Sequence, residues 1–190
     1  MPPKPKITRE MIIDAAWDIV RTSGENNLNA RNIADRLGCS TQPVLYAFHT
    51  MEEIKECVYR KADEYHSEYL MQMNASDPNP SVSIWKNYIR FSVEEKHLFR
   101  FLFQSNAFSG SMHGLIDDER LLPVLQAIGA QTRMDMNEVK TFFSAIYYPV
   151  HGIASLLANN SMDFNEAEYE TIIHMIRNGV LKEMEKDRHA

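Results

Sequence analysis

The sequence has little cysteine: two residues in 190, Cys39 and Cys57. Neither belongs to a Cys-x-x-Cys motif or to a Cys/His ladder, which excludes a disulfide framework and a zinc site and predicts two reduced thiols. The chain also lacks an apolar run near the roughly 18 residues that a membrane helix needs. Its N-terminus lacks the basic-then-apolar pattern of a secretion signal. We therefore expect a cytoplasmic protein with no membrane partner.

Motifs of catalysis and cofactor binding are absent too. The sequence contains no glycine-rich phosphate loop, and no nucleophile is placed beside a base. His97, His113 and the acidic run 117–119 do not have the spacing of metal ligands. No segment alternates convincingly as a strand. We expect an all-α protein that is not an enzyme and that holds no metal or cofactor.

Negative charge prevails, but it is unevenly distributed. The formal net charge is −6, which by itself argues against a nucleic-acid partner. Residues 1–60 contain eight basic and eight acidic side chains, so residues 61–190 carry the whole excess. The first nine residues contain Lys4, Lys6 and Arg9 and no acid. A cationic arm on a neutral head, followed by an acidic body, is typical of a DNA-binding protein whose body stays away from the phosphates.

The most informative segment is 28–56, which predicts two short helices, a tight turn and the start of a longer helix. Asn29 is a suitable N-cap for the first helix, and Gly38 can adopt the positive φ that ends it. Ser40 is placed to cap the second helix, and Thr50 with Glu53 forms a capping box for the third. Helix, tight turn and helix at this length is the helix-turn-helix plan, whose second helix enters the DNA major groove.

The rest of the chain also has helical periodicity, giving about nine helices in all. A first helix precedes the helix-turn-helix, and Pro/Asn/Ser-rich residues 74–81 form the clearest break. Asp163 with Glu166 is predicted to open the last helix through a second capping box. We divide the chain into a DNA-binding head, residues 1–52, and a helical effector-binding and dimerisation body, residues 53–190. The predicted helices cover residues 8–23, 30–37, 41–48, 51–73, 81–96, 97–104, 119–128, 136–158 and 165–186.

The head resembles the TetR family of transcriptional regulators over about residues 8–57. The residues that match the family pattern in order and spacing are Ala30, Arg31, Ile33, Ala34, Leu37, Gly38, Ser40, Phe48, Glu52, Glu53 and Ile54. Three positions depart from it: Leu45 replaces the usual Tyr, Ala47 the usual His and Met51 the usual Lys. The resemblance implies a homodimer that binds a (pseudo)palindromic double-stranded operator, and a repressor released by a small apolar or aromatic effector.

The second helix of the motif supplies the predicted DNA contacts. Gln42 suits adenine, and Thr41 and Pro43 suit a thymine methyl group. Other polar or basic side chains around the motif are expected at phosphates, with Arg31 able to reach a phosphate or a base. These are Arg31, Ser40, Tyr46, His49, Thr50, Lys55, Lys6 and Arg9. The alternative is that they are exposed polar residues beside caps and turns, in a helical ligand- or protein-binding module that does not bind DNA specifically.

The body is rich in aromatic residues, most of which a helical bundle needs for its core. The expected effector-binding residues are Trp85, Phe103, Tyr147 and His151, with a core role as the alternative. The family's dimer bundle maps to the last two helices. Its expected residues form one apolar stripe on each helix, although both stripes also suit an intrachain core. The stripes are Ile146, Val150, Ile153 and Leu157, and Ile172, Ile176 and Val180.

Overall fold

Helices account for the regular structure of the chain. The computed structural model describes residues 7–72, 80–105 and 119–187, and these contain nine α-helices, two short 3-10 turns and no strand. The predicted all-α class is therefore confirmed. The chain forms two compact units. Unit 1 comprises Met1–His66 and Glu95–Phe108, and unit 2 comprises Ser67–Glu94 and Ser109–Ala190.

The first helix of unit 1, α1 (Arg9–Ser23), has its predicted boundaries because both ends are capped. The Thr8 hydroxyl accepts a hydrogen bond from the Met11 backbone N–H at 3.2 Å. Gly24 ends the helix with a φ of +83°, a conformation that favours glycine. A single 3-10 turn, η1 (Glu25–Asn27), then leads to the helix-turn-helix.

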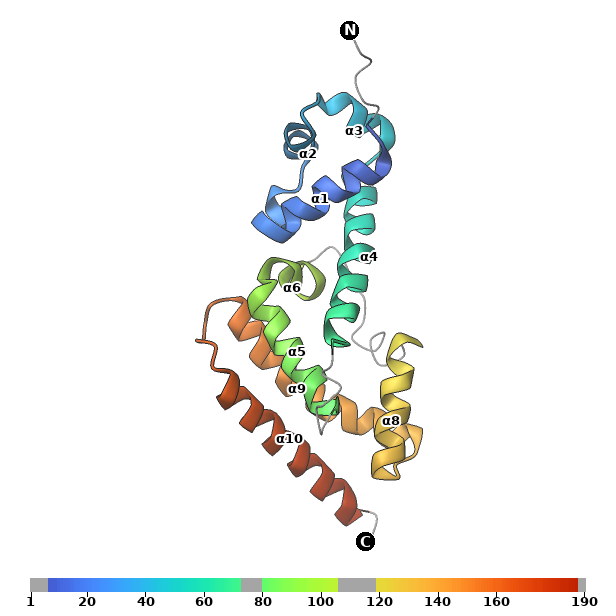
Figure 1. The fold of residues 1–190 in the computed structure, drawn as a ribbon, viewed down its shortest axis with the longest axis vertical. Helices are drawn as coiled ribbons and strands as arrows, with labels where there is room; N and C mark the ends of the chain where they lie inside the picture. Colours follow the sequence, from blue (N-terminus) through green and yellow to red (C-terminus); the bar gives the residue numbers. More distant parts are fainter. Residues whose placement is uncertain (1–6, 73–79, 106–118, 188–190) are drawn as a thin grey trace. The chain divides into compact units, whose positions relative to one another are not determined.

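The predicted helix-turn-helix is present as α2 (Ala30–Leu37) and α3 (Thr41–Ala47), which lie side by side across from α1 (Figure 1). The Asn29 side chain caps α2 by accepting from the Asn32 N–H at 2.9 Å. Gly38 closes α2 in the left-handed conformation, with a φ of +64°. Ser40 occupies the N-cap position of α3, but its side chain makes no capping hydrogen bond, so that part of the expectation is wrong.

Two further helices complete unit 1. The long helix α4 (Met51–Leu70) begins at the predicted Thr50 cap, whose hydroxyl accepts from the Glu53 N–H at 3.2 Å, and its first residues through His66 belong to this unit. Trp17 of α1 packs edge-on against Tyr65 of α4, with ring centroids 5.4 Å apart. Helix α6 (Lys96–Phe103) packs against α1 as well, and Arg21 of α1 is ion-paired with Glu95 at its start.

Unit 2 is built on α5 (Pro80–Glu94), which contacts α9 (Met136–Ala158) and α10 (Glu166–Asp187), as Figure 1 shows. The turn η2 (Glu119–Leu121) and helix α8 (Leu122–Thr132) pack on the same unit through α9. Trp85 of α5 and Phe143 of α9 meet in its core, with ring centroids 4.6 Å apart. At the surface, Lys86 of α5 pairs with Glu170 of α10 at 3.0 Å.

Of the last two helices, α9 begins at the predicted residue, whereas α10 is capped differently from the prediction. A capping box formed by Asp135 and Glu138 opens α9. In α10 the cap is Asn165, whose side chain accepts from the Glu168 N–H at 3.4 Å. The predicted Asp163 capping box is therefore wrong, and the carbonyl of Asp163 instead accepts a hydrogen bond from the Tyr169 hydroxyl at 2.7 Å.

Helix α9 also corrects the expectation about apolar runs. Residues 141–158 contain no Asp, Glu, Lys or Arg, and among the described helices α9 is long and apolar enough to cross a membrane by length and composition. Serines, tyrosines and His151 interrupt this stretch, which hid it from a search for unbroken apolar residues. In unit 2 this helix contacts α5, α8 and α10, and it supplies core residues.

Candidate functional site

The surface of α3 has one buried and one exposed face. Val44 and the following Phe48 are buried and anchor the helix in unit 1. At about 100° per residue, positions 41, 45, 42 and 46 follow one another around another side of the helix. All four are exposed. The predicted base readers Thr41 and Gln42 therefore lie on one continuous surface.

Leu45 stands at the centre of this face, between Thr41 and Gln42 around the helix axis. Leu45 is 57% exposed, and Tyr46 beside it is 75% exposed. The sequence marked Leu45 only as a departure from the family pattern. The same helical periodicity would have placed it among the candidate contact residues, because it lies four residues after Thr41.

The other predicted contact residues are distributed around this face. Ser40, His49 and Thr50 flank α3 and are exposed, and Arg31 is exposed on α2. Pro43 is half-buried. Lys6 lies outside the described residues.

Two of the predicted phosphate contacts are engaged within unit 1. The Arg9 guanidinium donates a hydrogen bond to the Ala47 carbonyl and lies over the Phe48 ring, 3.8 Å from its centroid. It thereby links the start of α1 to the end of α3. Lys55 of α4 pairs with Glu25 of η1 at 3.2 Å. Both side chains thus have a structural role in the head beside the predicted one.

Three of the four predicted effector-binding residues converge in unit 2. Trp85 and Tyr147 are buried, with ring centroids 6.3 Å apart, and His151 lies 5.5 Å from the Tyr147 ring. Phe103 belongs to unit 1 instead, where it packs on His66.

A polar interaction lies inside this aromatic cluster of Trp85, Tyr88, Phe143, Tyr147 and His151. The Tyr88 hydroxyl is 2.7 Å from Nδ1 of His151 and 3.4 Å from the Tyr147 hydroxyl. Burial raises the pKa of Tyr88 well above its usual value, so the hydroxyl keeps its proton. It can donate to Nδ1 of His151 when the neutral imidazole carries its proton on Nε2. Burial lowers the pKa of His151 below its ordinary value of 6.5, which favours that neutral imidazole.

Acidification should therefore destabilise the protein through His151. Because the folded-state pKa is depressed, the unfolded chain binds the proton first, and stability falls as the pH decreases below about 6.5. We expect His151→Gln, which removes the titration and keeps an acceptor for Tyr88, to lose less stability than the wild type between about pH 7.5 and about pH 5.5. Urea unfolding at the two pH values measures this, and equal losses in both proteins would contradict it. The pKa of His97 is also lowered, so the stability of the His151→Gln protein should still fall somewhat as the pH decreases.

The predicted dimer residues are partly used within the single chain. Ile146, Val150 and Leu157 are buried, and Ile153 is half-buried. On α10, the predicted residues Ile172, Ile176 and Val180 are half-buried.

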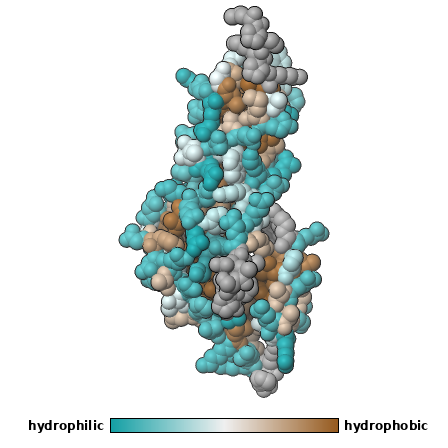
Figure 2. All heavy atoms as spheres, viewed as in Figure 1, coloured by the Kyte–Doolittle hydropathy of each residue, from teal (hydrophilic) through white to brown (hydrophobic). Residues whose placement is uncertain are grey.

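A different apolar stripe on α9 remains exposed. Tyr148, Gly152 and Leu156 follow at intervals of four residues, and Leu156 is 47% exposed. On α10, Met175 is 69% exposed, and it is followed four residues later by Gly179. Beyond the adjacent backbone of its own helix, no described heavy atom lies within 4 Å of where a Cβ would stand on Gly152 or Gly179, so the backbone of another helix can approach there closely. Figure 2 shows apolar side chains near the turn between α9 and α10, where Met162 and Phe164 are also exposed.

Known proteins resemble this chain in fold. No protein-family model matches the sequence, and neither does any curated protein. A crystal structure of a transcriptional regulator from Rhodococcus sp. Rha1 superposes with a TM-score of 0.67 at 18% identity, covering 91% of this chain and 95% of that one. The multidrug binding protein EbrR, complexed with imidazole, superposes with a TM-score of 0.54 at 19% identity, covering 88% of each chain. The all-α fold predicted from the sequence is thus shared with two solved structures and is confirmed.

Proposed function

We propose that the protein is a sequence-specific DNA-binding transcriptional regulator that reads DNA with α3. The observation that carries the proposal is the continuous exposed face of Thr41, Gln42, Leu45 and Tyr46 on the second helix of a helix-turn-helix. A side chain in the major groove must be free of its own protein, and this face has that property. The fold shared with a transcriptional regulator supports the proposal.

Each residue of the face has a role that its chemistry suits. Gln42 forms paired hydrogen bonds to adenine, and Leu45 and Thr41 contact thymine methyl groups. The flanking exposed residues hold the phosphates and set the orientation of the helix. These are Arg31, Ser40, Tyr46, His49 and Thr50, with Pro43 at the edge of the base-reading surface.

The regulator acts as a homodimer on a (pseudo)palindromic operator, since two heads are needed to read two half-sites. The interface comprises the α9 stripe of Tyr148, Gly152 and Leu156 and the α10 positions Met175 and Gly179, together with the half-buried Ile172, Ile176 and Val180. Exposed apolar side chains and open glycine positions on long helices suit close helix packing.

A small apolar or aromatic effector controls the regulator, most simply as a repressor that is released by the ligand. Trp85, Tyr147 and His151 form an aromatic cluster that includes a polar group, and this chemistry suits such a molecule. EbrR, of related fold, is described as a multidrug binding protein. The effector shifts the equilibrium between two arrangements of the heads only as far as it binds them with different affinity, and α4 is the lever between head and body. The site of action is the cytoplasm.

Selection from a random duplex library tests the function directly. We expect enrichment of a (pseudo)palindromic sequence that is bound more tightly than a scrambled duplex. On that sequence, Gln42→Ala and Leu45→Ala should each lose about 1–3 kcal/mol of discrimination at one base pair per half-site, while binding to the scramble changes little.

The matched control is Gln131→Ala on α8, an exposed glutamine outside the head. It should retain the discrimination of the wild type. Equal loss on selected and scrambled DNA would contradict the base-reading role of Gln42 and Leu45. No enrichment even at low salt would favour a helical ligand- or protein-binding module.

A further inference from the structure

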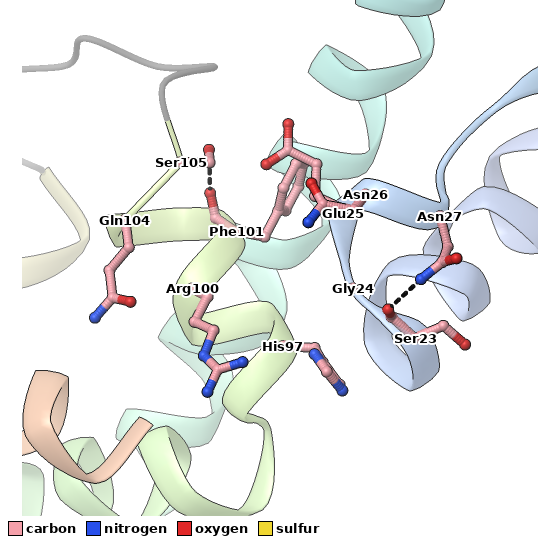
Figure 3. Close-up of a pocket in the computed structure, with 10 residues that line it drawn as sticks. All are labelled: Ser23, Gly24, Glu25, Asn26, Asn27, His97, Arg100, Phe101, Gln104 and Ser105. Carbon is pink, nitrogen blue, oxygen red and sulfur yellow. Dashed lines mark hydrogen bonds between the residues drawn. The ribbon is translucent and has the colours of Figure 1, made fainter. Parts of the chain in front are cut away.

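A cavity of about 420 Å³ lies within unit 1, between η1 and α6 (Figure 3). One wall is formed by residues 23–27, and the other by His97 and Arg100 of α6 with Gln104 and Ser105, which follow the helix. The buried Phe101 adds an apolar surface. This volume falls in the lower part of the range of small-molecule sites. The cavity belongs to a different unit from the aromatic cluster.

The charge of the walls favours an anion. His97, Arg100 and Gln104 follow at helical spacing, and Figure 3 shows the His97 and Arg100 side chains leaving α6 toward the same side. Glu25 is the one acid among the lining residues, and it is ion-paired with Lys55 at 3.2 Å. Its carboxylate points away from Arg100 in Figure 3. Burial lowers the pKa of His97, and the positive charges of Arg100 and Lys96 lower it further, which shows a positive field at this wall.

Neutral hydrogen-bonding groups complete the lining. The Asn26 amide points toward α6 in Figure 3, and Gln104 and Ser105 contribute an amide and a hydroxyl group. The Ser105 hydroxyl donates to the Phe101 carbonyl at 2.8 Å, which leaves its oxygen as an acceptor. A guanidinium with neutral side-chain amides on the neighbouring walls suits a carboxylate, which it can hold through charge-assisted hydrogen bonds. The adjacent Phe101 ring suits the carbon skeleton of a small metabolite rather than a bare inorganic ion.

We propose that this cavity binds a small organic anion, a carboxylate-bearing metabolite, with Arg100 as the main contact and Asn26 and Gln104 as further hydrogen-bonding partners. The ligand bridges η1 and α6. It is chemically distinct from the apolar or aromatic molecule expected in unit 2.

The cavity wall is tied directly to the helix-turn-helix. The Asn27 side chain donates to the Ser23 carbonyl at 2.6 Å, and the Asn32 side chain of α2 donates to the Asn27 carbonyl at 2.7 Å. A ligand that holds η1 therefore acts on the start of α2 through contacts inside one unit. This regulatory role rests on the proposed DNA-binding function, whereas binding of the anion does not.

Calorimetric titration of the full chain with citrate or succinate at fixed ionic strength tests the binding. We expect saturable binding that is about tenfold weaker in Arg100→Gln, because one charge-assisted hydrogen bond is lost. Arg90→Gln on α5 makes the same charge change at an exposed ion pair with Glu166 and should bind like the wild type. Glycerol, as a neutral polar probe, should not bind. Binding of neither anion, or equal weakening in both arginine variants, would overturn the proposal.

Thermal unfolding shows whether Arg100→Gln is folded. Asn26→Ala is a second variant at an exposed position, and it should weaken citrate binding without lowering the unfolding temperature. Unchanged citrate affinity in a folded Asn26→Ala protein and a folded Arg100→Gln protein would also overturn the site.

The regulatory part is measured on the selected duplex. Citrate should change the DNA affinity of the wild type and leave that of Arg100→Gln unchanged. Citrate binding without any sequence-selective DNA binding would support the anion site and contradict the regulator function. Citrate binding that leaves the affinity for a selected duplex unchanged would overturn the coupling through Asn27.

Discussion

Replacing Arg21 with glutamine should lower the free energy of unfolding by about 3 kcal/mol, and Glu95→Gln should lower it less. The Arg21 Nε donates to the two Glu95 oxygens at 2.9 and 3.1 Å, and the Tyr65 hydroxyl donates to Glu95 at 3.0 Å. The Glu95 side chain is 9% exposed, whereas that of Arg21 is 43% exposed. Loss of Arg21 therefore leaves a buried carboxylate with too few donors, while loss of Glu95 leaves a cation that water can reach.

Urea unfolding of the two single variants and the double variant measures this asymmetry. The hydrogen bond to Glu95 also raises the pKa of the Arg21 guanidinium, so Arg21 stays charged. Arg36→Gln is the matched control, since Arg36 pairs with Asp18 at 3.4 Å on the exposed surface. We expect it to cost less than about 1 kcal/mol. If Arg21→Gln and Arg36→Gln lowered the free energy of unfolding equally, burial of Glu95 would not increase the contribution of its ion pair to stability.

Leu156→Glu combined with Met175→Glu should convert the proposed dimer to monomers and weaken binding to a two-half-site duplex by about 100-fold or more. Both side chains are exposed in the single chain, so the changes leave the core of unit 2 intact. In a dimer they would place four carboxylates in an apolar interface, where charge is strongly disfavoured. A monomer also lacks the increase in DNA affinity that a dimer has because its two heads are linked and bind neighbouring half-sites together.

Sedimentation velocity gives the oligomeric state, and titration of the selected duplex and of a single half-site gives the affinities. The single half-site should be bound equally by both proteins. Leu122→Glu on α8 introduces the same charge at another exposed leucine and should leave the dimer unchanged. A double variant that still sediments as a dimer would place the interface elsewhere on the chain.

The boundaries in the head could be predicted because local chemistry sets them. Thr8, Asn29 and Thr50 each cap the helix that follows, and Gly38 provides the left-handed residue that the turn requires. Each signal lies within a few residues of the backbone group that it satisfies. The start of α10 was harder, since Asp163 and Asn165 both precede it and both are suitable caps.

Contacts between distant segments could not be predicted in this way. The sequence identifies Arg21 as basic and Glu95 as acidic. No feature of the residues around either one predicts that the two form an ion pair, because they are 74 positions apart. Arg9 was predicted to face a phosphate, and the packing of α1 on α3 brings it to Ala47 and Phe48. Trp85 and Tyr147 were grouped with Phe103 because all are aromatic, yet Phe103 belongs to unit 1. Composition predicts which kinds of residue line a site. Which of these residues come together in one site depends on how the chain folds.

Unit 1 is made of two separate segments of the chain, and this limits which recombinants of related genes can fold. A gene crossover between residues 71 and 94 would join one parent's α1–α4 to the other parent's α6. Arg21 and Trp17 would be inherited from one ancestor, whereas the acid opposite Arg21 would come from the other. Recombinants with a new operator specificity should therefore survive most often when the exchanged segment is confined to α2 and α3, because the proposed base-reading face of α3 is exposed.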